Sequence, residues 1–165
     1  MELYYPAGGF KPISRILNRL YIGCLASARD LIADNPNNIR FVLNCTPNKI
    51  VLPAPFRVMT MHFEDGSELG AEAVLFCTRW IYDLIELGNV MVCCHAGISR
   101  SPAITAAYLV RCGFNWDDAV EFITKRRPQV QIHPLISLSI RKALGVAPIK
   151  ESLIGGDKKD ETKTN

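Results

Sequence analysis

Short apolar runs and amphipathic stretches alternate along the chain and predict its secondary structure. The apolar runs are rich in β-branched residues and are predicted to be buried strands. They lie at residues 20–24, 39–45, 56–63 and 90–94. Residues 71–87 instead place apolar side chains at helical spacing, and Gly88-Asn89 ends the pattern. This segment is expected to be the crossover helix of a parallel β-α-β unit.

Three further helices are predicted in the C-terminal half of the chain. Pro102 fits the first turn of a helix, where its missing N–H is not needed, so a helix is expected over residues 101–111. Asn115 is positioned to cap the next helix, and residues 134–144 have the pattern of a final one. Strands that alternate with helices, followed by a helical half, predict a single α/β domain with a central, largely parallel sheet flanked by helices.

Composition and charge limit the number of domains and the classes of partner that are expected. A length of 165 residues with 48% hydrophobic residues suits one domain, assigned to residues 1–149, and residues 150–165 are expected to form a charged, disordered tail. No apolar run approaches the roughly 20 residues of a membrane span. The net charge of +3 is spread along the chain and gives little support to nucleic-acid binding. Neither a membrane nor a nucleic acid is therefore expected as a partner, and the oligomeric state is left open.

The cysteines indicate a reducing compartment. The chain has six cysteines, and most of them lie in apolar strand or helix patterns. Those expected to be reduced, buried thiols are Cys24, Cys45, Cys77, Cys93 and Cys112. This interpretation predicts an intracellular protein, cytoplasmic with the nucleus as the alternative location.

The strongest chemical signal is the segment 92–102, which separates Cys94 from Arg100 by five residues. It is entered from an apolar strand and left through a helix start. A tight glycine-containing loop at a helix N-terminus offers several backbone N–H donors to one anion, and Arg100 adds a planar fork of donors. The same positive field favours a thiolate on Cys94. The residues expected to bind a phosphate with Arg100 are His95, Ala96, Gly97, Ile98 and Ser99.

This segment resembles the cysteine-dependent protein tyrosine phosphatase superfamily, and Ala-Gly-Ile-Ser-Arg-Ser at 96–101 resembles its dual-specificity branch. The resemblance extends upstream to residues 14–23 and 39–44 and downstream to Arg127-Pro128. The chain is similar to the atypical dual-specificity phosphatases. Loop residues 95–99 contain no lysine or arginine, unlike lipid-directed relatives, and RNA triphosphatases end the motif in Asn-Arg-Thr. The resemblance implies removal of phosphate from phosphotyrosine and phosphoserine or phosphothreonine of a phosphorylated protein, through a phosphocysteine and without a cofactor or metal.

The resemblance also implies roles for residues outside the loop. The Ser101 hydroxyl is expected to help the cysteine sulfur leave in the second chemical step. The departing oxygen needs a proton, and the family places an aspartate on a loop before the crossover helix. Asp65 stands at that place, with Glu64 as the reserve candidate. The alternative is that Asp65 is only a turn residue before Gly66.

The chain departs from the family immediately before the nucleophile, where Cys93 replaces the usual histidine. Cys93 supplies no imidazole, so the alternative function is a catalytically weak or silent phosphate-binding pseudophosphatase. His62 and His133 are isolated from any metal-ligand spacing and are expected to be structural. Cys45 ends the strand that lies beside the nucleophile strand in this family. It is the candidate redox partner of Cys94, with simple packing in the sheet as the alternative.

Overall fold

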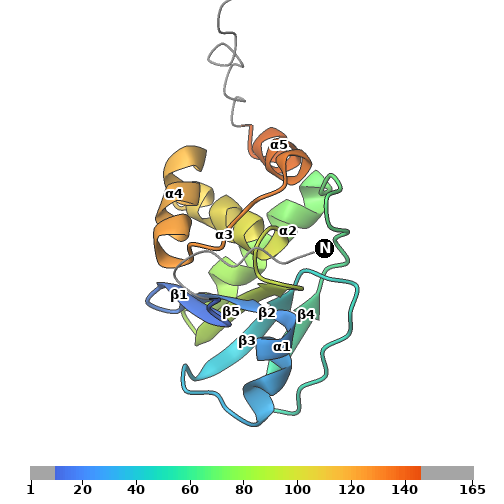
Figure 1. Ribbon diagram of the computed structural model, residues 1–165, viewed down its shortest axis with the longest axis vertical. Helices are drawn as coiled ribbons and strands as arrows, with labels where there is room; N and C mark the ends of the chain where they lie inside the picture. Colours follow the sequence, from blue (N-terminus) through green and yellow to red (C-terminus); the bar gives the residue numbers. More distant parts are fainter. Residues whose placement is uncertain (1–9, 146–165) are drawn as a thin grey trace, which may run out of the picture.

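A five-stranded sheet with helices on both faces forms the described part of the chain, residues 10–145 of a computed structural model (Figure 1). The tail assigned to residues 150–165 lies outside this range. The strands are β1 (Ile13–Leu17), β2 (Leu20–Cys24), β3 (Ile39–Asn44), β4 (Arg57–Thr60) and β5 (Asn89–Cys94). The helices are α1 (Leu25–Arg29), the 3₁₀ turn η1 (Asp30–Ile32), α2 (Ala71–Ile85), α3 (Arg100–Arg111), α4 (Trp116–Arg126) and α5 (Pro134–Ala143).

The strand order puts β5 at the centre of the sheet. The order is β1-β2-β5-β3-β4, and β5 pairs in parallel with both β2 and β3. The strand pair β1 and β2 is antiparallel, whereas β3 and β4 are parallel. A central parallel strand is covered on both faces, which is why β5 is an unbroken apolar run. The predicted fold class, an α/β domain with a largely parallel sheet, is confirmed.

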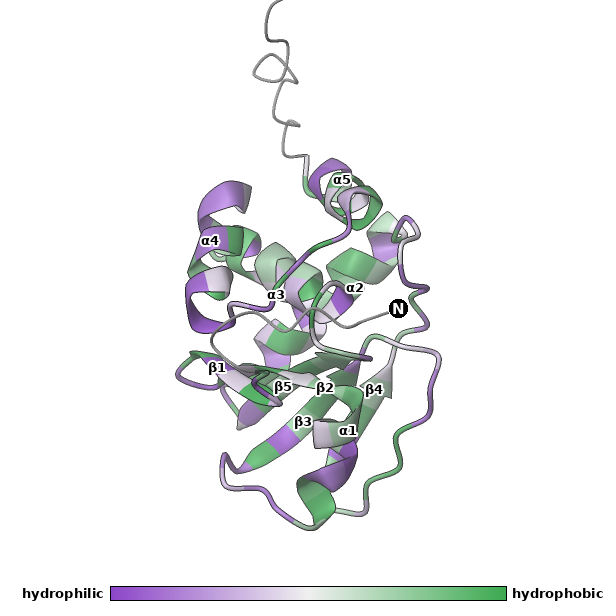
Figure 2. Cartoon of the chain, in the orientation of Figure 1, coloured by the Kyte–Doolittle hydropathy of each residue, from purple (hydrophilic) through white to green (hydrophobic). Residues whose placement is uncertain are grey.

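Alternate residues of β5 enter two different apolar layers. Val90, Val92 and Cys94 belong to the larger core, which the sheet shares with α2, α3, α4 and α5. Met91 and Cys93 belong to the smaller core on the other face, with residues of α1 and η1. Figure 2 shows the strands as mainly hydrophobic and the outer surfaces of the helices as more hydrophilic. The two neighbouring cysteines therefore lie on opposite faces of the sheet.

The predicted elements are present with small differences at their ends. The last strand before the crossover helix is shorter than residues 56–63, and α3 begins at Arg100 rather than residue 101. Asn115 caps α4 as predicted, because its side chain accepts a hydrogen bond from the Asp118 N–H at 2.8 Å. The interpretation of Cys112 as a buried thiol is wrong, since it follows the last turn of α3 and is exposed. No helix among residues 10–145 is long and apolar enough to cross a membrane.

Candidate active site

The carboxyl end of β5 delivers Cys94 to the loop 95–99, which leads directly into α3. We call residues 95–99 the phosphate loop. Ligands of open α/β sheets bind at this edge, beyond the carboxyl ends of the strands. Gly97 has a φ of +68°, and a Cβ at this position would lie 2.7 Å from the carbonyl oxygen of Gly23. The tight turn therefore requires glycine here.

Carbonyl groups of the phosphate loop are held from outside the loop. The His95 oxygen accepts a hydrogen bond from the Leu25 N–H at 3.1 Å, and the Ile98 oxygen accepts one from the Gln131 N–H at 2.8 Å. In a trans peptide unit the C=O and the following N–H point in opposite directions. Carbonyls that face outward therefore turn the loop N–H groups toward the enclosed space, which is the arrangement of an anion-binding site.

Arg127 holds the two carbonyls in the middle of the loop. Its side chain is fully buried. The Nε atom donates to the Gly97 oxygen at 2.7 Å, and Nη2 donates to the Ala96 oxygen at 3.3 Å. Nη1 donates to the Lys11 oxygen at 2.7 Å and the Ser14 hydroxyl at 3.0 Å. Burial lowers the pKa of Arg127 to about 10. In the sequence Arg127 is marked only by the family resemblance, and its contacts with the loop are not predictable from its position.

The first two residues of α3 contact the reacting groups. The Ser101 hydroxyl donates to the Cys94 sulfur at 3.2 Å. Arg100 is buried, and its Nη1 donates to the Phe63 oxygen at 2.9 Å, just before the predicted acid. Arg100 Nε lies 3.7 Å from Oδ1 of Asp65 and makes no hydrogen bond within residues 10–145. A buried donor of this kind fits an oxygen of a phosphate.

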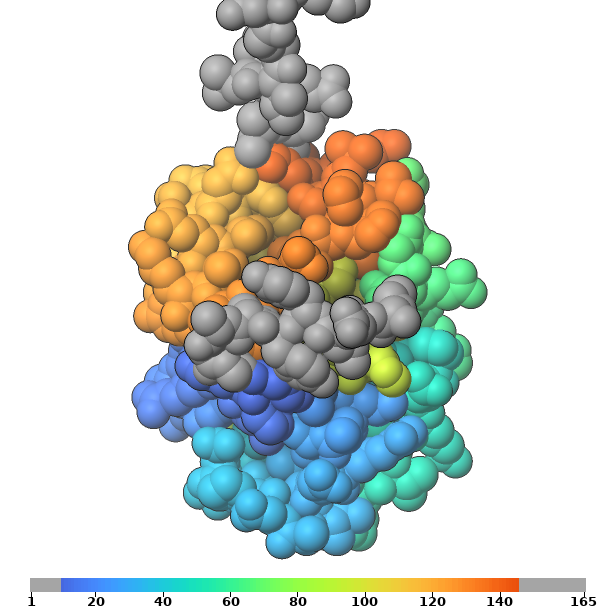
Figure 3. Space-filling model, viewed as in Figure 1, coloured from blue at the N-terminus to red at the C-terminus, as the bar shows by residue number. Residues whose placement is uncertain are grey.

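One open cleft of about 830 Å³ contains these groups. Figure 3 shows the yellow atoms that follow β5 at the surface between the orange helical segments and the blue strands. Asp65 and Cys94 both line the cleft. Glu64 lines a different hollow, with residues at the start of α2. The residues that line the cleft are Asp65, Gly66, Cys94, His95, Ala96, Ile98, Ser99, Arg100, Gln131, Ile132, His133 and Pro134.

The ring of His133 caps α5 and also lies in the cleft. This residue was expected to have only a structural role, yet it lines the cleft beside Asp65 and Cys94. His62 lies with Glu64 in the neighbouring hollow and does not line the cleft. The available signal was that His133 directly precedes Pro134, a position that caps a helix. Such a cap is on the surface, but nothing local in the sequence places it next to the phosphate loop.

Cys45 lies on the same side of the sheet as the nucleophile. It belongs to the larger core together with Cys94, whereas Cys93 belongs to the opposite one. Burial raises the pKa of Cys45 well above its usual value, and neighbouring Cys77 raises it further. The Cys45 thiol is therefore held in its protonated form, which slows its reaction as a nucleophile.

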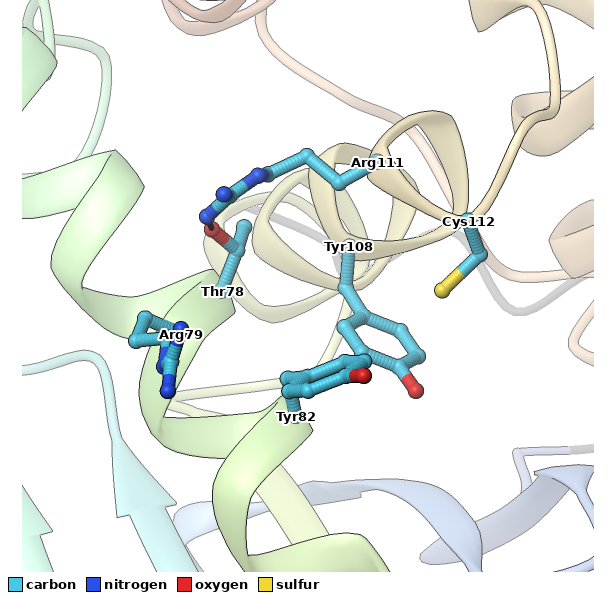
Figure 4. Close-up of a pocket in the computed structure, with 6 residues that line it drawn as sticks. All are labelled: Thr78, Arg79, Tyr82, Tyr108, Arg111 and Cys112. Carbon is cyan, nitrogen blue, oxygen red and sulfur yellow. Dashed lines mark hydrogen bonds between the residues drawn. The ribbon is translucent and has the colours of Figure 1, made fainter.

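A second, smaller hollow lies between α2 and α3, away from the phosphate loop (Figure 4). Its volume is about 210 Å³, and its lining includes Tyr108 and the exposed Cys112 at the far end of α3. None of its lining residues belongs to the phosphate loop, so a substrate bound there does not reach Cys94. Within residues 10–145, no group of three or more His, Cys, Asp or Glu side chains is placed to hold a metal ion.

Comparisons with known proteins identify the family of the chain. A family profile described as "Dual specificity phosphatase, catalytic domain" matches residues 20–138. Dual specificity protein phosphatase 7 of Homo sapiens is 28% identical over 132 residues, which cover 70% of this chain and 29% of that protein. Dual specificity protein phosphatase 16 of Homo sapiens is 32% identical over 125 residues, covering 71% of this chain and 18% of that protein. The chain thus spans less than a third of the length of these relatives.

Solved structures show the same likeness. The crystal structure of DUSP15 has a TM-score of 0.70 and 27% sequence identity, and the match covers 80% of this chain and 84% of that chain. The profile match includes the phosphate loop, the helix α3 and the segment that carries Asp65. The chain therefore belongs to the dual specificity phosphatase family, a branch of the cysteine-dependent protein tyrosine phosphatases.

Proposed function

We propose that the chain removes phosphate from phosphotyrosine and from phosphoserine or phosphothreonine of proteins. In the first step the Cys94 sulfur attacks phosphorus while the phosphate-loop N–H groups and Arg100 hold the other phosphate oxygens. The bond from phosphorus to the side-chain oxygen of the substrate breaks, and that oxygen takes the proton of the Asp65 carboxyl group. The products are a phosphocysteine and a free hydroxyl side chain.

The second step returns the enzyme to its starting state. A water molecule transfers a proton to the Asp65 carboxylate and attacks phosphorus, and the bond from phosphorus to sulfur breaks. The Ser101 hydroxyl, 3.2 Å from the Cys94 sulfur, donates a hydrogen bond to the departing thiolate. Inorganic phosphate then leaves the cleft, and Asp65 again carries the proton.

One observation carries the proposal: a thiol, a buried arginine with a free donor, and a carboxyl group meet in the same cleft. Asp65 is preferred to Glu64 as the acid because it lines the cleft of Cys94 and lies 3.7 Å from Arg100. The comparisons support the proposal at the level of the family, whose curated relatives are protein phosphatases. Five buried thiols without disulfides support a cytoplasmic location.

Turnover of an aryl phosphate by Cys94→Ser tests the mechanism. We expect this variant to fold and to lose hydrolysis below a few per cent of the wild-type rate, because a serine hydroxyl stays protonated where a thiolate forms. The matched control is Cys112→Ser, which removes an exposed thiol outside the cleft and should keep the wild-type rate. Substantial turnover by Cys94→Ser would show that another group is the nucleophile.

The alternative function is a phosphate-binding pseudophosphatase, and one observation favours it. Cys93 replaces the family histidine and packs in the smaller core, on the face of the sheet opposite Cys94. Because this residue is a cysteine, it supplies no imidazole to the phosphate loop. Binding of a phosphotyrosine peptide without turnover by the wild type would support this alternative and contradict the proposed enzyme.

A further inference from the structure

His133 is fixed in place by its position at the start of α5. Its Nδ1 atom accepts a hydrogen bond from the Leu135 N–H at 3.3 Å, and Pro134 follows as the first helical residue. An acceptor at Nδ1 leaves the proton of a neutral imidazole on Nε2. The bond from the Leu135 N–H therefore holds the ring at the start of α5.

The backbone around His133 is bound to the phosphate loop. The His133 N–H donates to the Ser99 hydroxyl at 3.0 Å. Two residues earlier, the Gln131 N–H donates to the Ile98 oxygen at 2.8 Å. These two hydrogen bonds therefore hold the start of α5 against the phosphate loop.

The ring of His133 lies against the loop that carries Asp65. A Cβ on Gly66 would lie 3.6 Å from Nε2, 3.7 Å from Cδ2 and 3.8 Å from Cε1 of His133. These are ordinary van der Waals separations for a Cβ, so the imidazole lies next to the side of Gly66 on which a side chain would project. Gly66 has a φ of +74°, which makes the turn after Asp65 one that favours glycine.

Besides the ion pair of Asp65 with Arg100, the segment 64–68 is anchored at its two flanks. The oxygen of Phe63, before it, accepts a hydrogen bond from Arg100 at 2.9 Å. The N–H of Leu69, after it, donates to the Ser139 hydroxyl of α5 at 3.0 Å. Asp65 lies between these anchors with its side chain 63% exposed, and the His133 ring borders the turn next to it at Gly66.

We infer that His133 is a positioning residue for the general acid. Its backbone is tied to the phosphate loop and its ring supports the turn at Gly66, so it sets the distance between the Asp65 carboxyl and a bound phosphate ester. This inference rests on the proposed function and adds to it a residue that does not itself transfer a proton. Misplacement of a catalytic group by about 1 Å costs up to about 100-fold in rate.

The substitution His133→Asn separates the ring from the helix cap. Asparagine is a good N-cap residue, so this variant keeps an acceptor for the N–H groups of α5 and loses the ring beside Gly66. His133→Ala loses both. We expect His133→Asn to keep the wild-type thermal unfolding midpoint within about 2 °C and His133→Ala to lower it, because loss of an N-cap costs about 1 kcal/mol.

The activity test uses two substrates that differ in their need for an acid. Phenyl phosphate has a basic leaving group that needs protonation, whereas p-nitrophenyl phosphate needs it much less. We expect His133→Asn to lower kcat for phenyl phosphate about 10-fold and for p-nitrophenyl phosphate less than about 2-fold. In an Asp65→Asn background the same substitution should have no further effect on either substrate, because the group being positioned is already absent.

The outcomes distinguish this inference from the proposed function. Equal losses with both substrates, or no loss, would overturn the positioning role while leaving the proposed phosphatase intact. A further loss from His133→Asn in the Asp65→Asn background would make His133 a proton donor in its own right and would also overturn it. If the wild type hydrolyses neither substrate, the proposed function fails and this inference fails with it.

Discussion

Replacing Arg127 by methionine removes the side chain that holds the middle of the phosphate loop. The guanidinium donates to the oxygens of Gly97 and Ala96 and to the Ser14 hydroxyl, and methionine fills a similar volume without any donor. The Lys11 oxygen also loses a bond, but it keeps a hydrogen bond from Gln129 at 2.9 Å. The substitution therefore leaves two buried acceptors and the half-buried Ala96 oxygen without this partner.

The size of the effect follows from two opposing contributions. Each buried acceptor left without a partner costs about 1–3 kcal/mol and the half-buried one costs less, which gives a total near 5 kcal/mol. In the opposite direction, burial lowers the pKa of Arg127 from 12.5 to about 10, and this shift corresponds to about 3 kcal/mol against the charged form. Methionine relieves that desolvation cost. The free energy of unfolding is therefore expected to fall by about 2 kcal/mol.

Urea unfolding followed by circular dichroism measures this change. The matched control is Arg126→Met, because Arg126 is exposed, donates to the Phe122 oxygen at 3.0 Å and stacks 3.4 Å from the Phe122 ring. An exposed contact of this type contributes about 0.5–1 kcal/mol. A second measurement is the inhibition constant of inorganic phosphate at low temperature, where Arg127→Met remains folded. We expect phosphate to bind about 10-fold more weakly, because carbonyls 96 and 97 are no longer held outward.

The result that would refute this reasoning is specific. If Arg127→Met unfolds at the same urea concentration as Arg126→Met, the buried guanidinium does not stabilise the fold. If it loses stability but binds phosphate like the wild type, the remaining hydrogen bonds from the N–H groups of Leu25 and Gln131 are sufficient to orient the loop. The first result would contradict the stabilising role of Arg127, and the second would contradict its role in phosphate binding.

Three further predictions concern the site and its thiols. Arg100→Lys should lower kcat/KM for an aryl phosphate about 100-fold, because an ammonium group cannot form the bidentate fork, and equal rates would contradict the clamp role. Peroxide-treated protein should contain a reversible disulfide between Cys45 and Cys94 by mass spectrometry, formed slowly because burial raises the Cys45 pKa; irreversible oxidation of Cys94 alone would argue against it. The free energy of unfolding should fall as the pH rises above about 9. Burial raises the pKa of Cys77 to about 12 and also raises that of Cys93. These thiols therefore stay protonated in the folded chain, whereas the unfolded chain loses their protons. Urea titrations at pH 8 and 10 test this, and Cys77→Ala should flatten the fall by about 1 kcal/mol per pH unit.

The phosphate loop was predictable because its signals are local. A strand end, Gly97, and the helix start before Pro102 lie within one short segment, and each has a backbone reason that holds in any fold. The unbroken apolar run of β5 fits its central position, but the strand order was not predicted from the sequence. The helix α1 was not predicted, because five residues are too few to show a helical period.

The hydrogen bonds that hold the phosphate loop from distant parts of the chain were not predictable in the same way. Arg127 reaches Gly97 across 30 residues, and His133 reaches Ser99 across 34. These contacts exist only after α4 has packed against α3, so spacing along the chain gives no sign of them. Asp65 and Glu64 are neighbours in the sequence, and only the turn at Gly66 decides which carboxyl group lines the cleft.

The exposure of Cys112 has a practical consequence for counting active molecules. Cys94 is only 2% exposed and is reached through the cleft, whereas Cys112 lies open to solvent at the other end of α3. An alkylating reagent therefore consumes one equivalent at Cys112 without inactivating the protein, and total thiol consumption overstates the number of competent sites. In the Cys112→Ser variant that background is removed, and the reagent bound per chain then reports the fraction of molecules whose cleft is correctly formed.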